Sequence, residues 1–481
     1  MSWEIYFTPR SLDEALSLLA EAPAQTRLVA GATDLMLELE RGVRQGVSRL
    51  VDITRIPGLD QIHLDEQGWI RMGPLVTHNQ VAGSKLMRER AFALARACWE
   101  VGAPQIRNRA TVAGNLITAS PANDSIPPLM ALEASLRLLS PDGERTVDLR
   151  SFYRGVRKTV IRPNEILVEI AFPAPPVGAR SAFVKLGLRR AQAVSVVNAA
   201  VVVELAGSAV RRAAIALGAV TPVIARAQAA ESWLVGKPLR EANIAEAARL
   251  ALQSAAPIDD LRGSAAYRRQ MVEVCVRRCL QAIAGEDAVR GYPDKPVMLA
   301  VASGARQTPL VESLRHQAGD EIRTTINGKA YRFTTGHDKS LLRLVREEAG
   351  LTGTKEGCAE GECGACSVFM DGVAVMACMV PAPCAHGAVI ETIEGLARQG
   401  ELHPLQRAFI EEGAVQCGYC TPGFLMAGAK LLEERPDPSS FEIQQAFAGN
   451  LCRCTGYYSI ISAVERAAAL MAGSKQPGDG G

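Results

Sequence analysis

No part of the sequence is apolar over a length that could cross a membrane as a helix. Even the segment AVSVVNAAVVVELAGSAV is interrupted by Asn198 and Glu204, whereas a membrane span needs about 20 predominantly apolar residues. The first residues also lack the pattern of a secretory signal, because Glu4, Asp13 and Glu14 interrupt what would have to be a basic start and an apolar core. We therefore expect a cytoplasmic protein without a membrane span.

An excess of charge of one sign is also lacking. The chain has 53 Lys and Arg residues against 51 Asp and Glu residues, which gives a formal net charge of +2, and no basic run stands out. Because nucleic-acid-binding proteins usually carry a basic patch or stripe, this composition argues against nucleic acid as a partner. Aromatic residues are few, at 5%, but hydrophobic residues make up 48% of the chain, as in an ordinary globular protein.

The 12 cysteines do not fit a disulfide framework. Such frameworks stabilise short secreted chains that have little hydrophobic core, and this chain has 481 residues, enough for two or three domains. Eight of the cysteines instead stand in tight local groups in the last third of the chain. In a reducing compartment these would be free thiols or metal ligands, so the pattern favours metal sites.

The first group of cysteines, CAEGECGAC, has the spacing of plant-type ferredoxins. Cys358, Cys363 and Cys366 form C-x₄-C-x₂-C, and Cys378 follows after eleven intervening residues. Four thiolates must surround two irons, and glycine is the residue that permits such a close, strained loop. The glycines are Gly357, directly before the group, and Gly361 and Gly364 within it. The alternative is a zinc site, but zinc ligands usually come as C-x₂₋₄-C pairs.

The second group has the form C-x₂-C followed later by C-x-C. Cys417 and Cys420 stand in QCGYCTPG, and Cys452 and Cys454 stand in NLCRCTG. We expect helices after Cys420 and before Cys452 to hold the two pairs at facing helix ends, where N-terminal dipoles would favour an anionic cluster. Structural zinc also uses paired cysteines, so this pattern alone leaves zinc open, and the ferredoxin-type group beside it shifts the balance to iron–sulfur.

Together these motifs resemble the two-cluster iron–sulfur subunit of the xanthine dehydrogenase, aldehyde oxidase and CO dehydrogenase family, over about residues 321–469. The resemblance implies a β-grasp, ferredoxin-like domain for the first [2Fe–2S] cluster and a four-helix domain for the second. It also implies that the second cluster lies nearer the molybdenum cofactor and that Gln416, which precedes its first cysteine, touches the pterin. The alternative for Gln416 is an ordinary polar residue that tunes the cluster.

The remaining cysteines are interpreted as structural, because lone buried cysteines behave as small hydrophobic residues. Cys275 and Cys279 lie four residues apart on a helical pattern, but two ligands without a nearby histidine make a poor metal site. The other two are Cys98 and Cys384.

Two small-residue turns in the first half could approach phosphate. The β-rich run RLV leads into Ala30-Gly31-Ala32-Thr33-Asp34, and a second such segment runs from Arg109 to Leu116. Turns of this kind allow backbone N–H groups to reach phosphate oxygens, although small residues also mark many ordinary turns. Neither is a G-x-G-x-x-G element, so a Rossmann dinucleotide site is not supported.

With SAFVKLGLRRAQAVSVVNAA and the order of its segments, the region 1–290 resembles the flavoprotein subunit of the same molybdenum hydroxylase family. The resemblance implies FAD in a two-lobed α/β fold of the vanillyl-alcohol-oxidase type, followed by a small α+β subdomain. The residues it assigns to the pyrophosphate are Leu28, Val29, Ala30, Gly31, Ala32, Thr33, Asp34 and Leu35, together with Ala110, Thr111, Gly114 and Asn115. The residues it assigns to the rest of the flavin environment are Thr77, His78, Asp124, Leu167 and Lys185. A lone histidine such as His78 is equally often hydrogen-bonded scaffold.

The chain departs from the family pattern in two ways. Where paired glycines are common, it has Gly31-Ala32 and Ala113-Gly114, and an alanine is tolerable there only if its φ is negative. The iron–sulfur part also follows the flavin part, whereas in xanthine dehydrogenase it comes first. A flexible linker would still let the domains dock.

We therefore expect a multidomain α+β protein. The expected parts are an FAD-binding domain over 1–177, a flavoprotein C-terminal subdomain over 178–287, a linker over 288–320, a plant-type ferredoxin-like [2Fe–2S] domain over 321–397 and a helical [2Fe–2S] domain over 398–472. Within the ferredoxin-like part, RTTINGKAYRF predicts a hairpin around Asn327 and Gly328, and SLLRLVREEAG predicts a helix that ends near Gly350.

The predicted function is electron transfer within a molybdenum hydroxylase. The resemblance implies a large partner subunit that binds the molybdopterin cofactor, an assembly that is a dimer of heterodimers, and an external electron acceptor. A self-contained NAD(P)H-dependent flavoprotein reductase would explain the same cofactors, but it would leave Gln416 and the C-x-C domain without a purpose. A non-enzyme scaffold with structural zinc is the third alternative.

Overall fold

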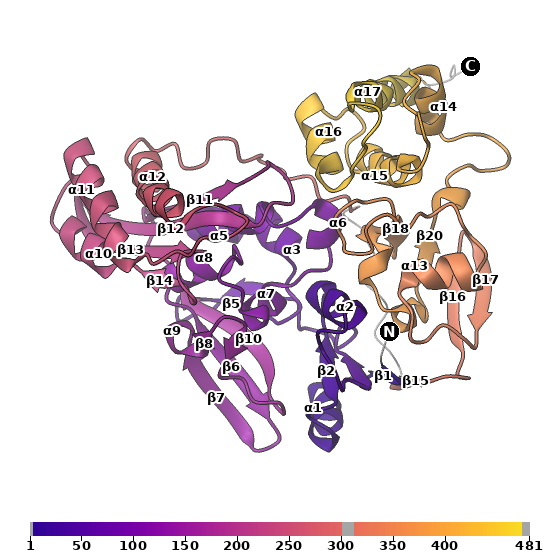
Figure 1. The fold of residues 1–481 in the computed structure, drawn as a ribbon, viewed down its shortest axis with the longest axis horizontal. Helices are drawn as coiled ribbons and strands as arrows, with labels where there is room; N and C mark the ends of the chain where they lie inside the picture. The colour runs from indigo at the N-terminus through magenta and orange to yellow at the C-terminus, as the bar shows by residue number, and fades with distance from the viewer. Residues whose placement is uncertain (1–2, 301–311, 474–481) are drawn as a thin grey trace. The chain divides into compact units, whose positions relative to one another are not determined.

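The computed structural model describes residues 3–300 and 312–473. The chain divides into two compact units. The first unit comprises Met1–Ile56, Gly102–Arg109 and Val297–Gly481, and the second comprises Pro57–Val101 and Ala110–Pro296. Figure 1 shows both helices and strands along the chain, with helices alone after β20 (Val389–Glu391), which confirms the predicted mixed α/β, multidomain character. Part of the predicted linker, 301–311, lies outside the described residues.

The first unit begins with a small, largely parallel sheet in the order β15-β1-β3-β2. β1 and β2 both run parallel to β3, and β15 pairs with β1 in antiparallel register, with Tyr6 opposite His316. Helix α1 begins where the Ser11 side chain accepts a hydrogen bond from the backbone N–H of Glu14, a standard N-cap. The elements are β1 (Ile5–Thr8), α1 (Leu12–Glu21), β2 (Thr26–Val29), α2 (Thr33–Glu40), β3 (Arg49–Asp52), α6 (Pro104–Arg107) and β15 (Leu314–His316).

The predicted ferredoxin-like part of the first unit contains a mixed sheet in the order β17-β16-β20-β18-β19. The predicted hairpin is confirmed: Asn327 and Gly328 both have positive φ and join β16 to β17, as a type I′ turn requires. The predicted helix is also confirmed, although its last turn is π-helical. The elements are β16 (Ile322–Ile326), β17 (Lys329–Phe333), α13 (Leu341–Arg343), η2 (Leu344–Glu348), β18 (Ser367–Met370), β19 (Val373–Met376) and β20 (Val389–Glu391).

The last part of the first unit is helical, as the sequence predicts from about Pro404 onward. Helix α16 starts with a capping box between Ser439 and Glu442, and Phe424 on α15 packs edge to face against Phe447 with ring centroids 4.9 Å apart. The helices are α14 (Pro404–Glu411), α15 (Thr421–Glu434), α16 (Ser440–Ala446) and α17 (Tyr458–Gly473).

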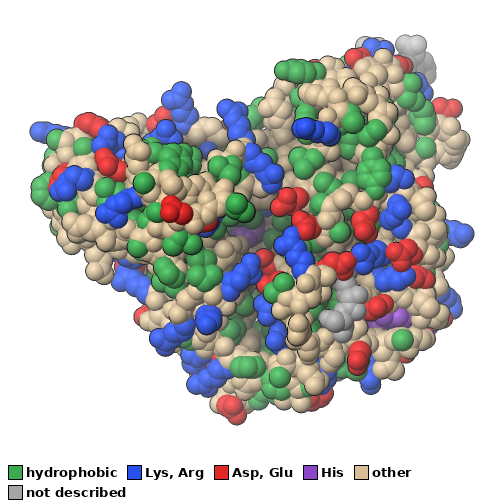
Figure 2. Space-filling model, viewed as in Figure 1, with side chains coloured by type: hydrophobic (Ala, Val, Ile, Leu, Met, Phe, Trp, Pro, Cys, Tyr) green, Lys and Arg blue, Asp and Glu red, His purple; other side chains and the backbone are tan. Residues whose placement is uncertain are grey.

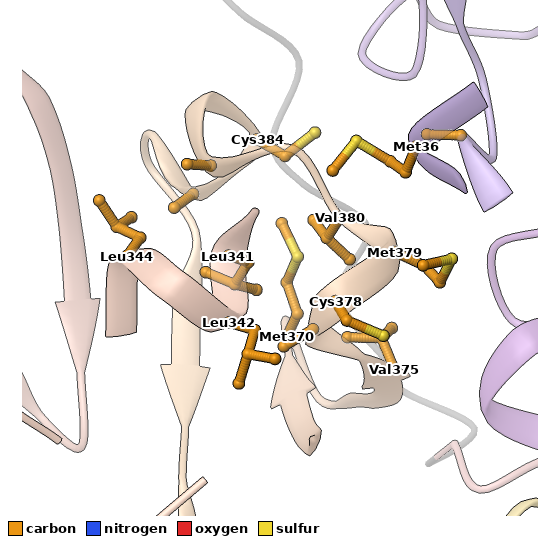
Figure 3. Packing of buried hydrophobic residues seen from close by; sticks show 14 of the residues in the cluster. Met36, Leu341, Leu342, Leu344, Met370, Val375, Cys378, Met379, Val380 and Cys384 are labelled. Atoms are coloured by element: carbon orange, nitrogen blue, oxygen red, sulfur yellow. The ribbon is translucent and has the colours of Figure 1, made fainter. Parts of the chain in front are cut away.

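One hydrophobic core joins the amino-terminal sheet to the ferredoxin-like sheet. Met36 of α2 and the segment from Cys378 to Cys384 belong to the same buried cluster as Leu341 of α13, and Figure 3 shows Met36 beside that segment. The first unit is therefore built from parts of the flavoprotein sequence and from the iron–sulfur sequence.

Besides the two-stranded antiparallel sheet β8-β9, the second unit contains two larger antiparallel sheets. In the first sheet, of order β4-β5-β10-β6-β7, Ile70 and Met72 alternate along β5 and are fully buried, as is Leu136 of β6. These residues pack into one core with helices α3, α5, α7 and α8. The elements are β4 (Ile62–Leu64), β5 (Trp69–Met72), α3 (His78–Gly83), α4 (Lys85–Arg90), α5 (Phe92–Trp99), α7 (Val112–Thr118), α8 (Ile126–Ala131), β6 (Ser135–Ser140), β7 (Gly143–Asp148), α9 (Leu149–Phe152), β8 (Tyr153–Gly155), β9 (Lys158–Thr159) and β10 (Ile166–Pro173).

The other sheet of the second unit has the order β11-β12-β13-β14 and packs against α10, α11 and α12. Its central strand β12 is buried along ten consecutive residues, which explains why its sequence is apolar without alternation. The elements are β11 (Arg180–Gly187), β12 (Ser195–Ala206), β13 (Ala209–Gly218), β14 (Ala225–Arg226), α10 (Gln228–Leu234), α11 (Glu241–Ala251), η1 (Leu252–Ser254) and α12 (Ala265–Ala284).

Within residues 3–300 and 312–473, no helix combines the length and the apolarity that crossing a membrane requires. On the face shown in Figure 2, basic and acidic side chains are interspersed, in keeping with the near-neutral net charge.

Candidate cofactor sites

The four cysteines of the ferredoxin-type group lie as two pairs in the first unit. Cys366 precedes β18 and Cys378 lies in a short 3₁₀ turn after β19, and their sulfurs are 3.4 Å apart. Cys358 and Cys363 form a second sulfur–sulfur hydrogen bond within the loop. Cys366 and Cys378 are buried, whereas Cys358 and Cys363 are partly exposed.

The loop that carries these cysteines turns backbone N–H groups toward sulfur. The Cys358 Sγ accepts hydrogen bonds from the N–H groups of Glu360 and Glu362, each at 3.3 Å. Gly361 has a φ of 75°, a conformation that favours glycine. A Cβ on Gly357 would lie 2.7 Å from the Cys363 Sγ, so no side chain fits there. Such N–H···S bonds stabilise thiolates and set cluster potential.

The C-x₂-C and C-x-C cysteines also form two pairs, one sulfur from each motif. The Cys454 and Cys417 sulfurs are 3.7 Å apart, and Cys420 and Cys452 share a hydrogen bond. The Cys452 Sγ accepts from the Thr455 Oγ1 at 3.2 Å and from two backbone N–H groups at 3.4 Å.

At this second site, an N-terminal helix dipole reaches only one of the two cysteine motifs. Cys420 is the N-cap of α15, as predicted. Cys452 follows the end of α16 and a short 3₁₀ turn, Phe447–Gly449, so the helices lie where they were predicted, but an N-terminal dipole reaches the site only from α15. Hydrogen bonds from Thr455 take the place of the second dipole as stabilisers of negative charge.

The paired arrangement matches the donor set of a [2Fe–2S] cluster. A [2Fe–2S] cluster takes two ligands at each of two irons. Two pairs of thiols at each site supply that donor set.

The two sites differ in exposure. Cys417, Cys454 and Gln416 are exposed, whereas two ligands of the ferredoxin-type group are buried. The predicted partner-facing residue Gln416 therefore lies at the surface, beside the exposed pair of sulfurs.

The cysteines outside the two groups are buried, as predicted for structural residues. Burial raises the pKa of Cys275 to about 12 and that of Cys384 to about 12, so both are neutral thiols at physiological pH. The pKa of Cys279 is also raised by burial. The Cys384 Sγ lies 2.9 Å from the Tyr6 hydroxyl.

The first predicted flavin segment, Leu28 to Leu35, leaves the end of β2 and enters α2. A turn that joins a parallel strand to a helix N-terminus presents free N–H groups to anions. Arg109, the first residue of the second predicted phosphate segment, donates from Nε to the carbonyl of Gly31 at 3.5 Å. Ala32 has a φ of 64°, so the condition of a negative φ fails there. Ala113, by contrast, lies within helix α7.

Replacing Ala32 with glycine should stabilise the protein by about 1 kcal/mol, because the left-handed conformation strains any residue with a Cβ. The control Ala113→Gly should have the opposite sign and cost about 1 kcal/mol, since glycine within a helix is unfavourable. Urea unfolding of the two variants measures both effects. A destabilised Ala32→Gly would show that the turn does not hold this conformation in solution.

In the second unit, two predicted flavin segments lie side by side. Thr77 and Thr111 form an isolated β-bridge, and each caps a helix by accepting a backbone hydrogen bond, from Gln80 for α3 and from Gly114 for α7. The tertiary structure thereby brings GPLVTH and RATVAGNL together. Ala110 contributes its carbonyl, which accepts the backbone N–H of His78 at 3.0 Å.

The other predicted residues of the second unit differ in character. The His78 ring is buried and its Nδ1 lies 3.3 Å from the Cys98 Sγ, which supports its scaffold alternative. The Asn115 Oδ1 accepts from the Ser125 hydroxyl at 2.6 Å. Leu167 is buried in β10 beside a β-bulge.

Asp124 and Lys185 form a buried ion pair. The Lys185 Nζ donates to the Asp124 Oδ2 at 2.6 Å and to the Glu100 carbonyl at 3.1 Å. The other carboxylate oxygen of Asp124 accepts from Ser195 at 2.6 Å and from Asn198 at 2.9 Å. The resemblance assigned Asp124 and Lys185 individually, but it did not assign Ser195 and Asn198, which lie in the segment SAFVKLGLRRAQAVSVVNAA and are 71 and 74 residues away from Asp124.

Four family models match the chain in succession. They are the FAD binding domain in molybdopterin dehydrogenase over 1–175, the CO dehydrogenase flavoprotein C-terminal domain over 182–283, a 2Fe-2S iron-sulfur cluster binding domain over 324–387 and a [2Fe-2S] binding domain over 392–465. FAD and two [2Fe–2S] clusters are therefore the cofactors of this chain.

Different relatives match the iron–sulfur part and the flavin part of the chain, and each match covers nearly the whole relative. The nicotinate dehydrogenase small FeS subunit of Eubacterium barkeri is 50% identical over 146 residues, which are 30% of this chain and 93% of that protein. The carbon monoxide dehydrogenase medium chain of Hydrogenophaga pseudoflava is 33% identical over 277 residues, which are 58% of this chain and 96% of that protein.

Solved structures agree with these relatives. A carbon monoxide dehydrogenase chain from Hydrogenophaga pseudoflava superposes with a TM-score of 0.57 at 33% identity, covering 60% of this chain and 99% of that chain. A quinoline 2-oxidoreductase chain from Pseudomonas putida 86 gives 0.56 at 27% identity, covering 60% and 99%. The chain therefore belongs to the molybdenum hydroxylase family, which includes xanthine dehydrogenase and CO dehydrogenase, as an oxidoreductase subunit that joins the FAD-binding and both [2Fe–2S] domains of its electron-transfer part.

Proposed function

We propose that this chain relays electrons from a separate large subunit, which binds the molybdopterin cofactor, to an external acceptor. The observation that carries the proposal is the difference in exposure between the two cysteine sites. Cys417 and Cys454 lie at the surface, whereas Cys366 and Cys378 are buried within the first unit. An exposed site suits electron exchange with a partner, and a buried site suits electron transfer within the chain.

When bound, the clusters carry single electrons and FAD carries two, so the set can connect a two-electron oxidation to several kinds of acceptor. The proposed ligands are Cys358, Cys363, Cys366 and Cys378 for the first cluster and Cys417, Cys420, Cys452 and Cys454 for the second. Backbone N–H groups and Thr455 stabilise the negative charge of the sulfurs. The turn at Ala32 and the capped helix α7 supply N–H groups for phosphate.

The finer fold assignments are part of this proposal. They are a vanillyl-alcohol-oxidase type of FAD-binding fold, a β-grasp ferredoxin-like domain, a four-helix domain for the second cluster and the domain boundaries given above. The mixed sheet with parallel β16 and β20 supports the second of these, and the helices α14 to α17 support the third. A cytoplasmic location is also proposed, because cluster cysteines need a reducing compartment.

The surface around the exposed pair is the proposed docking site for the large subunit. Large apolar side chains are exposed in the segments that flank these cysteines, and exposed apolar patches commonly mark protein interfaces. They are Ile410, Val415, Tyr419, Leu451 and Tyr458. Gln416 lies within the same segment and is proposed to contact the pterin.

Replacing Tyr458 with aspartate should weaken binding of the large subunit at least about 30-fold, because buried tyrosines often dominate interfaces. Tyr458 is 84% exposed in the chain alone, so the fold should tolerate the change. The control is Val177→Asp in the second unit, whose side chain is 90% exposed and lies outside the proposed surface. Copurification of the tagged chain from its native cells, with molybdenum and iron analysis, measures the result.

Equal recovery of the large subunit with both variants would contradict this docking site. Purification of the wild-type chain with iron but with neither a large subunit nor molybdenum would count against the proposed function as a whole. Rapid reduction of that single chain by NADH would then favour a self-contained reductase. The relatives are named for nicotinate, carbon monoxide and quinoline, so we assign the choice of substrate to the partner. We also propose a dimer of heterodimers, which the mass of the copurified complex tests.

A further inference from the structure

The loops that carry the two groups of cysteines contact each other directly in the first unit. The backbone N–H of Leu451, which precedes the ligand Cys452, donates to the carbonyl of the ligand Cys363 at 3.0 Å. The hydroxyl of Tyr419, between Cys417 and Cys420, donates to the carbonyl of Glu356 at 2.6 Å. Each hydrogen bond therefore joins a neighbour of one site to the loop of the other.

The contact is too close for side chains. A Cβ on Gly364 would collide with the carbonyl of Gly449, and a Cβ on Gly423 would collide with the carbonyl of Gly364. Asn450 lies at this junction, is 2% exposed, and donates from Nδ2 to the carbonyl of Gly364 at 3.4 Å. Backbone packs against backbone at this junction, and Asn450 is a buried side chain whose amide bridges it.

A residue of the flavoprotein sequence completes the junction. Gln105, on α6, is 1% exposed and donates from Nε2 to the Asn450 Oδ1 at 2.9 Å. Its neighbour Ile106 reaches the ferredoxin-type loop, since a Cβ on Gly361 would lie 3.0 Å from its Cδ1. Asn108 anchors the same segment by donating to the carbonyls of Met298 and Ala374, each at 2.9 Å.

We propose that Gln105 is a positioning residue that fixes, through Asn450, the distance between the two iron–sulfur clusters. This inference rests on the proposed assignment of the cysteines to the clusters. The chain of amides from Gln105 to Asn450 to the Gly364 carbonyl occupies both ends of the Asn450 side chain and so allows it one orientation. Electron exchange and magnetic interaction between two clusters both fall steeply with distance. A residue of the flavin-binding sequence thereby controls electron exchange between the two clusters that donate electrons to the flavin.

Substitution of Gln105 can distinguish a positioning role from a role in which the side chain only fills space. Gln105→Met keeps the length and volume of the side chain but removes the amide, so the core stays filled while Asn450 loses its partner. A packing role predicts little change. The positioning role predicts that each cluster keeps its iron and its own spectrum while the interaction between the clusters changes.

The test uses the full chain with both clusters reduced by dithionite. In the wild type, low-temperature electron paramagnetic resonance should show a mutual interaction between the clusters, as splitting or faster spin relaxation. In Gln105→Met this interaction should be lost or spread into a broad distribution, at unchanged iron content. Hydrogen exchange at the Leu451 amide should become about 5- to 10-fold faster, because one supporting hydrogen bond is gone.

The matched control is Thr324→Val, which also removes one buried hydrogen bond from the ferredoxin-like part, from Thr324 Oγ1 to the Ala388 carbonyl at 2.9 Å, but leaves the cluster loops untouched. It should preserve the interaction. A second variant, Gln105→Asn, keeps the amide but draws it back from Asn450 and should act like Gln105→Met, which covers the case in which the methionine variant does not fold.

An unchanged interaction in the Gln105 variants would overturn the proposal, and so would the loss of iron from either cluster in them. A wild type whose two reduced clusters do not interact would overturn it as well. A wild type that contains no second cluster would instead overturn the cysteine assignment on which the inference rests, so the two failures are distinguishable.

Discussion

Replacing Cys363 with serine should remove the ferredoxin-type cluster and about half of the bound iron, since each [2Fe–2S] cluster holds two irons. Replacing Cys452 with serine should remove the other cluster and stop electron delivery from the molybdenum partner. The reason is the pairing of sulfurs: Cys363 pairs with Cys358, and Cys452 pairs with Cys420, so each site loses one ligand of an iron. FAD should remain bound in both variants.

Electron paramagnetic resonance of the dithionite-reduced protein, with iron analysis, measures this result. The wild type should show two distinguishable species, because the hydrogen bonding and exposure of the two sites differ. Cys275→Ala, which removes a buried cysteine outside both groups, should leave both signals intact. A single cluster signal in the wild type, or the loss of both signals from either substitution in a folded protein, would refute the assignment of two independent clusters.

Replacing Lys185 with methionine should cost about 3–5 kcal/mol of folding free energy, because it leaves the Asp124 carboxylate buried without its cation. The pair is 2.6 Å apart and both side chains are 7% exposed. Bound FAD should fall with the stability of the second unit. The double variant Lys185→Met/Asp124→Asn should recover part of the loss, since a neutral amide still accepts the hydrogen bonds of Ser195 and Asn198.

Lys85→Met provides the matched control, because Lys85 pairs with Glu89 at 3.6 Å with both side chains well exposed. Exposed pairs contribute little, so its effect should stay within about 0.5 kcal/mol. Urea unfolding, monitored by circular dichroism and by flavin release, measures the folding free energy of all three variants. A loss below about 1 kcal/mol for Lys185→Met would mean that Asp124 finds another partner or takes up a proton.

Local sequence predicted those features whose cause is local. The hairpin at Asn327 and Gly328 follows from two consecutive positive φ values, which the residue types themselves favour. The helix predicted after Cys420 is α15, which has a proline in its first turn, where proline is favoured. Cysteine spacing predicted both groups of ligands, because a cluster constrains residues that are close in the chain. The ligand and flavin residues remain predictions that the paired sulfurs and the capped helices support.

Features that depend on distant parts of the chain were not predicted. The conformation of Ala32 was left open as a condition on φ and proved left-handed. The helices after Cys420 and before Cys452 were predicted, but only α15 directs an N-terminal dipole at the site, and Cys452 takes hydrogen bonds from Thr455 instead. Ser195 and Asn198 lie in the segment that carries the family resemblance, but neither was assigned to Asp124, because their hydrogen bonds depend on how the chain brings β12 beside it.

The sequence by itself determined the family, the cofactors and the order of the cofactor-binding parts, because spacing between nearby ligands and turns survives as a pattern in the chain. Only the tertiary structure decided how those parts are divided between the two units. It placed 1–56 and 102–109 with the iron–sulfur region and brought Gln105 to Asn450, 345 residues away. Contacts of this kind are selected by burial and hydrogen bonding between surfaces, and such surfaces exist only once the chain has folded.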